Sequence, residues 1–179
     1  MLSLSPFQLT DLSGTPQNFS GNSQSVVCFV KEDCPTCREV MPVLAAMHEA
    51  LAPHLDFLVV GQTAQGNEKL QQDFDLPFSL LDDSALKVSF ATDVETVPTL
   101  LVTDALGSVV SQEVGFVRAD WQSLVSELLE QCSGDGLALD WSVLPEWRPG
   151  CGSLSVDPAY ADRLQAEADN SPIRARRID

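Results

Sequence analysis

Two cysteines separated by two residues stand between a strand-like run and a helix-like run, and this arrangement restricts the fold more than any other feature. Residues 25–31 are mostly β-favouring apolar residues, which suits a buried strand. Cys34 and Cys37 follow this run. We therefore expect a strand that leads into a CxxC motif at the N-terminus of a helix. The apolar face of that helix is spaced at i, i+4, i+7 and i+11 and consists of Val40, Leu44, Met47 and Leu51.

Apolar runs and turn residues predict the remaining elements up to residue 131. The order β-α-β-α followed by β-β-α predicts an α/β fold with a mixed central β-sheet flanked by helices. Asp120 is placed to cap the last helix. The predicted elements are a strand at 57–60, a helix at 68–74, a strand fragment at 79–81, a short helix at 85–90, a hairpin of 99–103 with 109–114, and a helix at 121–129.

The character of the sequence changes after Gln131. Residues 133–136 are a Ser-Gly-Asp-Gly cluster that breaks regular structure. We expect residues 1–131 to form one domain and residues 132–179 to form an irregular C-terminal extension, either packed on the domain or binding a partner. Asp157 and Pro158 resemble the start of a short helix that runs to about residue 169. Trp141 and Trp147 are expected to anchor the extension.

The charge balance excludes several classes of partner. The chain has 10 Lys and Arg against 26 Asp and Glu, a formal net charge of −16. Such a surface cannot neutralise phosphates, so nucleic acid and anionic membranes are not expected partners. No apolar run approaches a membrane span and no signal peptide is recognisable near Met1, so we expect a cytoplasmic location.

A CxxC at a helix N-terminus favours thiol–disulfide exchange. The first thiol, Cys34, faces the unsatisfied amides of the helix, which stabilise its thiolate. The second thiol, Cys37, can resolve a mixed disulfide. An inert pair is one alternative. Structural metal is another, because a CxxC is half of a tetrahedral zinc site; the further ligands would have to come from His48, His54, Cys132 or Cys151.

Several further residues give the chain a resemblance to the thioredoxin fold. Pro42 lies five residues after Cys37, where thioredoxins carry a helix-kinking proline, and 97–99 resembles the family's Val-Pro-Thr segment with its cis-proline. The turn at 104–107 and Gly115 also match, while residues 7–14 resemble the opening strands of the redoxin branch (AhpC/TSA-like proteins and thiol–disulfide reductases). The resemblance covers about residues 5–130.

The resemblance implies roles for particular residues. Cys34 and Cys37 would be catalytic, and the substrate chain would contact Val97, Pro98, Pro35 and Thr36. Val97–Pro98 would be a cis peptide beside Cys34. The implied activity needs no cofactor and no metal. Its partners would be a protein disulfide substrate and an electron-donating reductase.

Other positions depart from the family pattern. Peroxiredoxins have Thr where this chain has Lys31, so peroxide reduction is disfavoured. Cys28 replaces the buried Asp of thioredoxin, and a neutral thiol accepts protons poorly. Glu32 and Asp33 oppose a Cys34 thiolate, whereas Arg38 and the helix dipole favour it, and the sequence leaves this balance open.

The function that these observations favour is thiol–disulfide exchange with protein or small-molecule disulfides. Two alternatives are a binding module of the same fold that uses the C-terminal extension, and a peroxiredoxin-like thiol peroxidase. We expect Cys34 to be more exposed than Cys37, with both sulfurs within disulfide reach. Cys151, between two glycines, is a possible accessory thiol if the extension packs near the active site.

Overall fold

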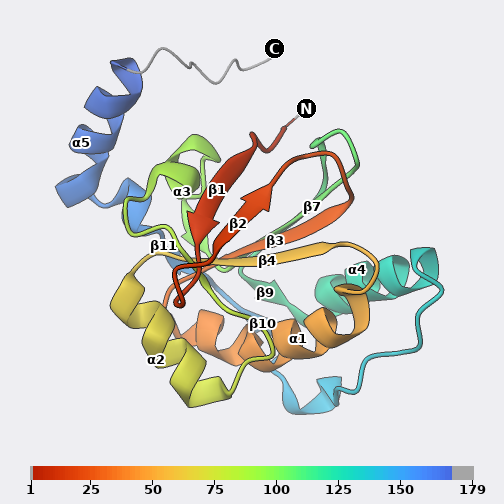
Figure 1. The fold of residues 1–179 in the computed structure, drawn as a ribbon. Coiled ribbons are helices and arrows are strands. Elements are labelled where there is room, and N and C mark those ends of the chain that lie inside the picture. The colour runs from red at the N-terminus through yellow and green to blue at the C-terminus, as the bar shows by residue number, and fades with distance from the viewer. Residues whose placement is uncertain (1, 171–179) are drawn as a thin grey trace.

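The computed structural model describes residues 2–170, and a five-stranded mixed sheet lies at its centre (Figure 1). The strand order is β5-β4-β3-β7-β8. The central strand β3 pairs parallel with β4 and antiparallel with β7, and all six of its residues are buried. This is the thioredoxin fold, as expected from the sequence. The strands are β3 (Ser25–Val30), β4 (Asp56–Gly61), β5 (Leu81–Asp82), β7 (Thr99–Thr103) and β8 (Val109–Val114).

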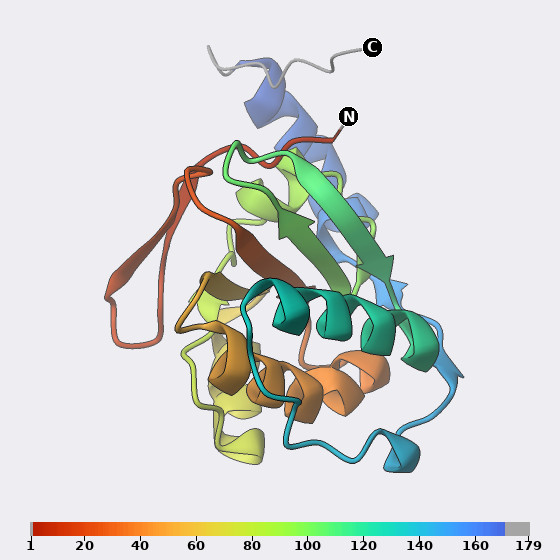
Figure 2. The same cartoon turned by 90° about the vertical axis from the view of Figure 1, so that its right-hand side faces the viewer.

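Helices cover the sheet and supply much of the core. The helices α1 and α4 lie side by side on one face (Figure 2). The buried face of α1 includes Val40, Leu44, Met47 and Leu51, so the apolar spacing in the sequence correctly identified the face that packs against the sheet. The helices of this part of the chain are α1 (Pro35–Leu51), α2 (Ala64–Phe74), α3 (Lys87–Ala91) and α4 (Arg118–Gln131).

A hairpin at the start of the chain lies outside the central sheet. Its strands are β1 (Phe7–Thr10) and β2 (Pro16–Phe19), which pair antiparallel. The ring of Phe7 stacks on that of Phe19 with 5.4 Å between centroids, and Phe19 is buried in the core. An isolated bridge between Asp11 and Leu81 connects the hairpin to the edge of the sheet.

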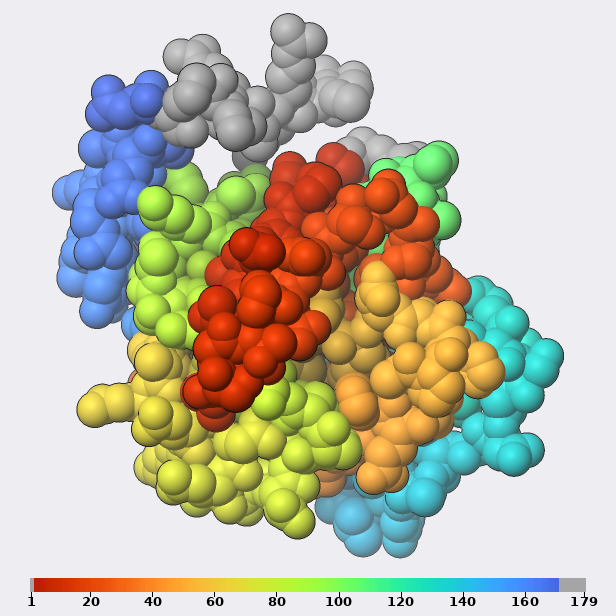
Figure 3. Space-filling view, in the orientation of Figure 1, coloured from red at the N-terminus to blue at the C-terminus, as the bar shows by residue number. Residues whose placement is uncertain are grey.

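We call residues 2–131 the body and residues 132–170 the extension. The extension leaves the end of α4, passes beside α1 and returns along the molecule to α5 (Figure 2). The helix α5 projects at one corner of the molecule (Figure 3). Two short body strands, β6 (Thr96–Val97) and β9 (Phe116–Val117), pair with it. The extension contains η1 (Trp141–Val143), β10 (Trp147–Arg148), β11 (Cys151–Gly152), η2 (Leu154–Val156) and α5 (Pro158–Asp169).

Some local predictions differ from the structure, among them the strand fragment at 79–81, which is Leu81–Asp82, and the short helix at 85–90, which is Lys87–Ala91. Asp120 is not the cap of α4: the helix begins at Arg118 after Val117, which makes no side-chain capping bond, so Asp120 lies in the first turn. The polar first turn hid this start from the apolar pattern. The helix predicted at 68–74 begins at Ala64. The side chain of Trp147 is 61% exposed, so it does not anchor the extension.

Candidate active site

Cys34 lies where β3 has ended and α1 begins. It is the N-cap of α1, and its sulfur accepts a hydrogen bond from the backbone N–H of Cys37 at 3.3 Å. Pro35 occupies the first helical position, where a backbone N–H would have no partner within the helix, so the absence of one costs nothing. The local sequence thereby aims the Cys34 sulfur at the free amides of the helix, and the first helical turn brings the two cysteines together.

The segment before Pro98 lies against Cys34. Val97–Pro98 is a cis peptide, and the Cys34 thiol donates a hydrogen bond to the Val97 carbonyl oxygen at 3.4 Å. Both the cis geometry and the contact with the cysteine pair were expected from the sequence, and both are confirmed.

Hydrogen bonds hold the pKa of Cys34 well below its ordinary value. The Cys37 side chain makes the strongest contribution, and burial opposes it. A hydrogen bond from the Cys151 side chain and backbone N–H groups of Cys37 and Thr36 lower the pKa further, to about 6. A thiol with this pKa is mostly thiolate at neutral pH, and the thiolate is the nucleophilic form.

Cys37 has the opposite electrostatic character. Burial raises the pKa of its thiol, and the hydrogen bond to Cys34 and the Cys34 charge raise it further. The backbone N–H of Lys31 donates to the Cys37 sulfur at 3.4 Å. Burial likewise raises the pKa of Cys28 on β3, which is a neutral core residue. The structure therefore favours the thiolate at Cys34 and the protonated thiol at Cys37.

The charged residues next to the motif make contacts with partners other than Cys34. Asp33 pairs with Lys31 at 3.3 Å. Glu32 accepts a hydrogen bond from Thr63 at 3.2 Å. Arg38 pairs with Asp73 at 2.6 Å and lies over the ring of Phe74. The sequence left open whether the neighbouring charges or the helix N-terminus set the pKa of Cys34; hydrogen bonds from Cys37, Thr36 and Cys151 set it, rather than these charged side chains.

The prediction that Cys34 is more exposed than Cys37 is wrong. Both residues have 0% exposed surface. The reason is the extension, whose strand β11 pairs with β6 and sets Cys151 opposite Val97. Thr36, expected to contact substrate, donates its hydroxyl hydrogen bond to the Pro149 carbonyl at 2.6 Å, and Pro35 is exposed.

Within residues 2–170 no group of three or more His, Cys, Asp or Glu side chains is placed to hold a metal ion. His48 packs against the rings of Phe57 and Phe78.

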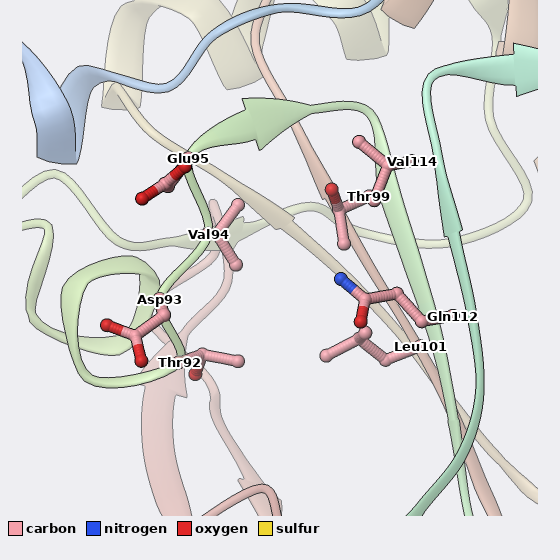
Figure 4. Close-up of a pocket in the computed structure, with 8 residues that line it drawn as sticks. All are labelled: Thr92, Asp93, Val94, Glu95, Thr99, Leu101, Gln112 and Val114. Carbon is pink, nitrogen blue, oxygen red and sulfur yellow. The ribbon is translucent and has the colours of Figure 1, made fainter. Parts of the chain in front are cut away.

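A separate pocket of about 140 Å3 lies between residues 92–95 and the strands β7 and β8, and none of the cysteines lines it (Figure 4).

Two residues of the site escaped the sequence reasoning. Gln62 directly follows β4 and is buried, with its amide directed at the extension. A polar residue at the end of an apolar strand was the available signal. Lys31 gave no signal in the sequence beyond its departure from the peroxiredoxin pattern, yet its ammonium group donates to the Gly152 carbonyl at 3.0 Å.

Comparison with known proteins supports the fold. No protein-family model matches the sequence, and no curated protein matches it. Among solved structures, the chain resembles a secreted Mycobacterium tuberculosis disulfide oxidoreductase homologous to E. coli DsbE, with 19% identity, a TM-score of 0.57, and coverage of 69% of this chain and 95% of that one. It also resembles the exposed lipoprotein thioredoxin Etrx1 of Streptococcus pneumoniae, with 18% identity, a TM-score of 0.61, and coverage of 70% and 99%. An uncharacterised conserved protein from Geobacillus kaustophilus matches at 18% identity and a TM-score of 0.62, covering 84% of this chain and 88% of that one.

Proposed function

We propose that this protein is a thiol–disulfide oxidoreductase in which Cys34 is the attacking thiol and Cys37 the resolving thiol. The observation that carries the proposal is the environment of the Cys34 sulfur. It caps α1, accepts the Cys37 N–H and has a pKa of about 6. The names of the similar structures, a disulfide oxidoreductase and a thioredoxin, agree with this chemistry.

The reaction consumes one substrate disulfide and yields two thiols. The Cys34 thiolate attacks one substrate sulfur, and the other sulfur leaves as a thiolate that takes a proton from water. Cys37 then attacks the Cys34 sulfur, which forms the Cys34–Cys37 disulfide and releases the second substrate thiol. The Cys37 proton leaves with that thiol. We propose a protein disulfide as the substrate and an electron-donating reductase as the partner that restores the two thiols.

The first test of the function is equilibration of the protein with dithiothreitol redox buffers, followed by alkylation and mass mapping of the cysteines. We expect a single two-electron Cys34–Cys37 couple. The second test is an insulin reduction assay in the Gly150→Ala background, in which a methyl group too close to Thr96 and Val97 uncovers Cys34. In this background, Cys34→Ser should abolish turnover and Cys37→Ser should trap a mixed disulfide. A folded protein with neither a redox couple nor turnover would instead support the binding-module alternative.

The cytoplasmic location expected from the sequence stays a prediction. The similar Mycobacterium tuberculosis protein is secreted and the similar Streptococcus pneumoniae protein is an exposed lipoprotein, so proteins of this fold also work outside the cytoplasm. No helix within residues 2–170 has the length and apolar character needed to cross a membrane. Fractionation of cells followed by immunodetection would test the cytoplasmic proposal.

A further inference from the structure

Part of the extension lies on the active site as an added strand. We call residues 148–153 the docked segment. Its strand β11 pairs antiparallel with β6, so that Cys151 faces Val97 and Gly152 faces Thr96. The preceding β10 pairs antiparallel with β9. The segment thus follows the backbone that leads to Pro98, where the thioredoxin resemblance implies that a substrate chain pairs.

Hydrogen bonds from active-site elements fix the position of the docked segment. The Thr36 hydroxyl, within the CxxC motif, donates to the Pro149 carbonyl at 2.6 Å. The Lys31 ammonium donates to the Gly152 carbonyl at 3.0 Å. One of these bonds lies before Cys151 in the sequence and the other after it. Together they fix the position of Cys151 in the docked segment.

A buried polar contact holds the far end of the docked segment. The Gln62 amide nitrogen donates to the Ser153 hydroxyl at 2.6 Å, and its oxygen accepts the N–H of Leu154 at 2.9 Å. The Ser155 hydroxyl donates to the Val94 carbonyl at 3.0 Å. Because buried polar groups are costly to leave unpaired, these bonds favour one docked arrangement over a loosely collapsed chain.

The fit at Gly150 leaves no room for a side chain. A Cβ there would lie 2.3 Å from the Thr96 Cγ2 atom and 2.8 Å from the Val97 carbonyl oxygen. Gly152, two residues later, is different: a Cβ there would meet nothing within 4 Å. Gly150→Ala should therefore displace the docked segment, and Gly152→Ala is the matched substitution that should leave it in place.

The docked segment presents its cysteine to the nucleophile. Cys151 lies opposite Val97 in the β11–β6 pairing, the Val97 carbonyl accepts the hydrogen bond of the Cys34 thiol, and Cys34 has no exposed surface beneath the segment. We propose that Cys151 is a third redox thiol and that the docked segment is an internal substrate strand, which exchanges a disulfide with Cys34. This proposal rests on the proposed function, because it requires Cys34 to perform thiol–disulfide exchange.

The internal exchange balances with a small disulfide such as oxidised glutathione. The Cys34 thiolate attacks one glutathione sulfur, forms a mixed disulfide and releases the first glutathione thiolate, which takes a proton from water. Cys151 then attacks the Cys34 sulfur, forms the Cys34–Cys151 disulfide and expels the second glutathione, which leaves with the Cys151 proton. Two protein thiols are oxidised and one oxidised glutathione is reduced to two thiols. Attack by Cys37 on Cys34 would convert this bond to Cys34–Cys37 and return the proton to Cys151, with no net redox change.

The test uses the Cys37→Ser variant, which removes the competing resolving thiol. The reduced variant is treated with excess oxidised glutathione, quenched in acid and mapped by peptide mass spectrometry. We expect a Cys34–Cys151 link within one chain, at a yield independent of protein concentration. Adding Gly150→Ala should lower the yield at least about fivefold and leave glutathione on Cys34, because overpacking displaces the segment. Adding Gly152→Ala should retain the link.

Each outcome separates this proposal from the proposed function. Glutathione on Cys34 without a Cys151 link, in a protein with a native circular dichroism spectrum, overturns the internal substrate and leaves the oxidoreductase intact. An equal yield of the link in the Gly150→Ala variant also overturns it. A Cys34 that carries neither glutathione nor a link to Cys151, in both the Cys37→Ser and the Cys37→Ser/Gly150→Ala proteins, overturns the proposed function itself. If Gly150→Ala does not fold, Thr36→Val, which removes the bond to Pro149, takes its place with the same expected loss.

Discussion

In the body, α1 buries an entire apolar face against the sheet, whereas the described part of the extension buries only Ser153, Ser155 and Leu164. Apolar burial holds the body together. The extension as a whole also packs partly buried apolar residues such as Leu137, Trp141 and Leu144 against the core, but the docked segment is held by backbone pairing and hydrogen bonds around Cys34. The docked segment can therefore detach at a free-energy cost well below that of unfolding the body. Local opening of this kind requires only the loss of the segment's own contacts.

The largest expected effect contrasts a core residue of the body with a large apolar residue of the extension. Leu44→Ala on α1 should lower the free energy of unfolding by about 2–5 kcal/mol, because it leaves a cavity in a fully buried site. Trp147→Ala should change it by less than about 0.5 kcal/mol, because that side chain is mostly exposed. Urea denaturation measures both. Equal losses would show that the extension belongs to the same cooperative core.

A second prediction tests release of the docked segment without unfolding. Gly150→Ala should raise the rate of Cys34 alkylation by iodoacetamide about tenfold, because overpacking of this order costs about 1–3 kcal/mol. The urea midpoint of the body should stay unchanged. Gly136→Ala is the control, since a Cβ there meets nothing within 4 Å. An unchanged alkylation rate in Gly150→Ala would mean that the segment does not cover the thiol in solution.

The pH dependence of Cys34 gives a smaller effect that links the two regions. Alkylation should be half-maximal near pH 6, the pKa of Cys34. Cys151→Ala should move the midpoint upward, because it removes a hydrogen bond that stabilises the thiolate, while Cys132→Ala should not. Since folding lowers the pKa of Cys34, its contribution to stability is complete above about pH 9 and declines as the pH falls towards 6. An alkylation midpoint that is unchanged in Cys151→Ala would show that Cys151 does not stabilise the Cys34 thiolate.

The smallest effects should come from ion pairs. Arg148 of the docked segment pairs with Glu39 on α1 at 3.2 Å, and Arg38 pairs with Asp73 within the body at 2.6 Å. Both pairs are partly exposed, so Glu39→Gln and Asp73→Asn should each cost less than about 1 kcal/mol. Only Glu39→Gln should raise the alkylation rate of Cys34, by less than about fivefold. A larger rise with Asp73→Asn would refute this assignment.

The body could be predicted from its sequence because its signals are local. The apolar spacing from Val40 identified the buried face of α1, and the turn at 104–107 identified the β7–β8 hairpin. The cysteine pair and the cis peptide at Pro98 followed from short motifs. The start of α4 was missed because Arg118 and Ala119 belong to a polar first turn without periodicity.

The cover over Cys34 could not be predicted in the same way. Strands of two residues, such as β10 and β11, show no alternation, and their partners lie far away in the sequence. The only signal was the pair of glycines around Cys151, which suggested an accessory thiol but not its position. Exposure of Cys34 was therefore misjudged from the body alone.

The attachment of the docked segment to the end of α4 through residues 132–147 has a kinetic consequence. Because Leu137, Leu139 and Trp141 of this connection pack against the core, the strand is held next to its own binding site and competes intramolecularly, at an effective concentration on the order of millimolar. A foreign disulfide at micromolar concentration would rarely displace it by mass action. Productive substrates must therefore either bind elsewhere on the molecule as well, or arrive while the segment is detached, which makes selectivity a matter of timing as much as of fit.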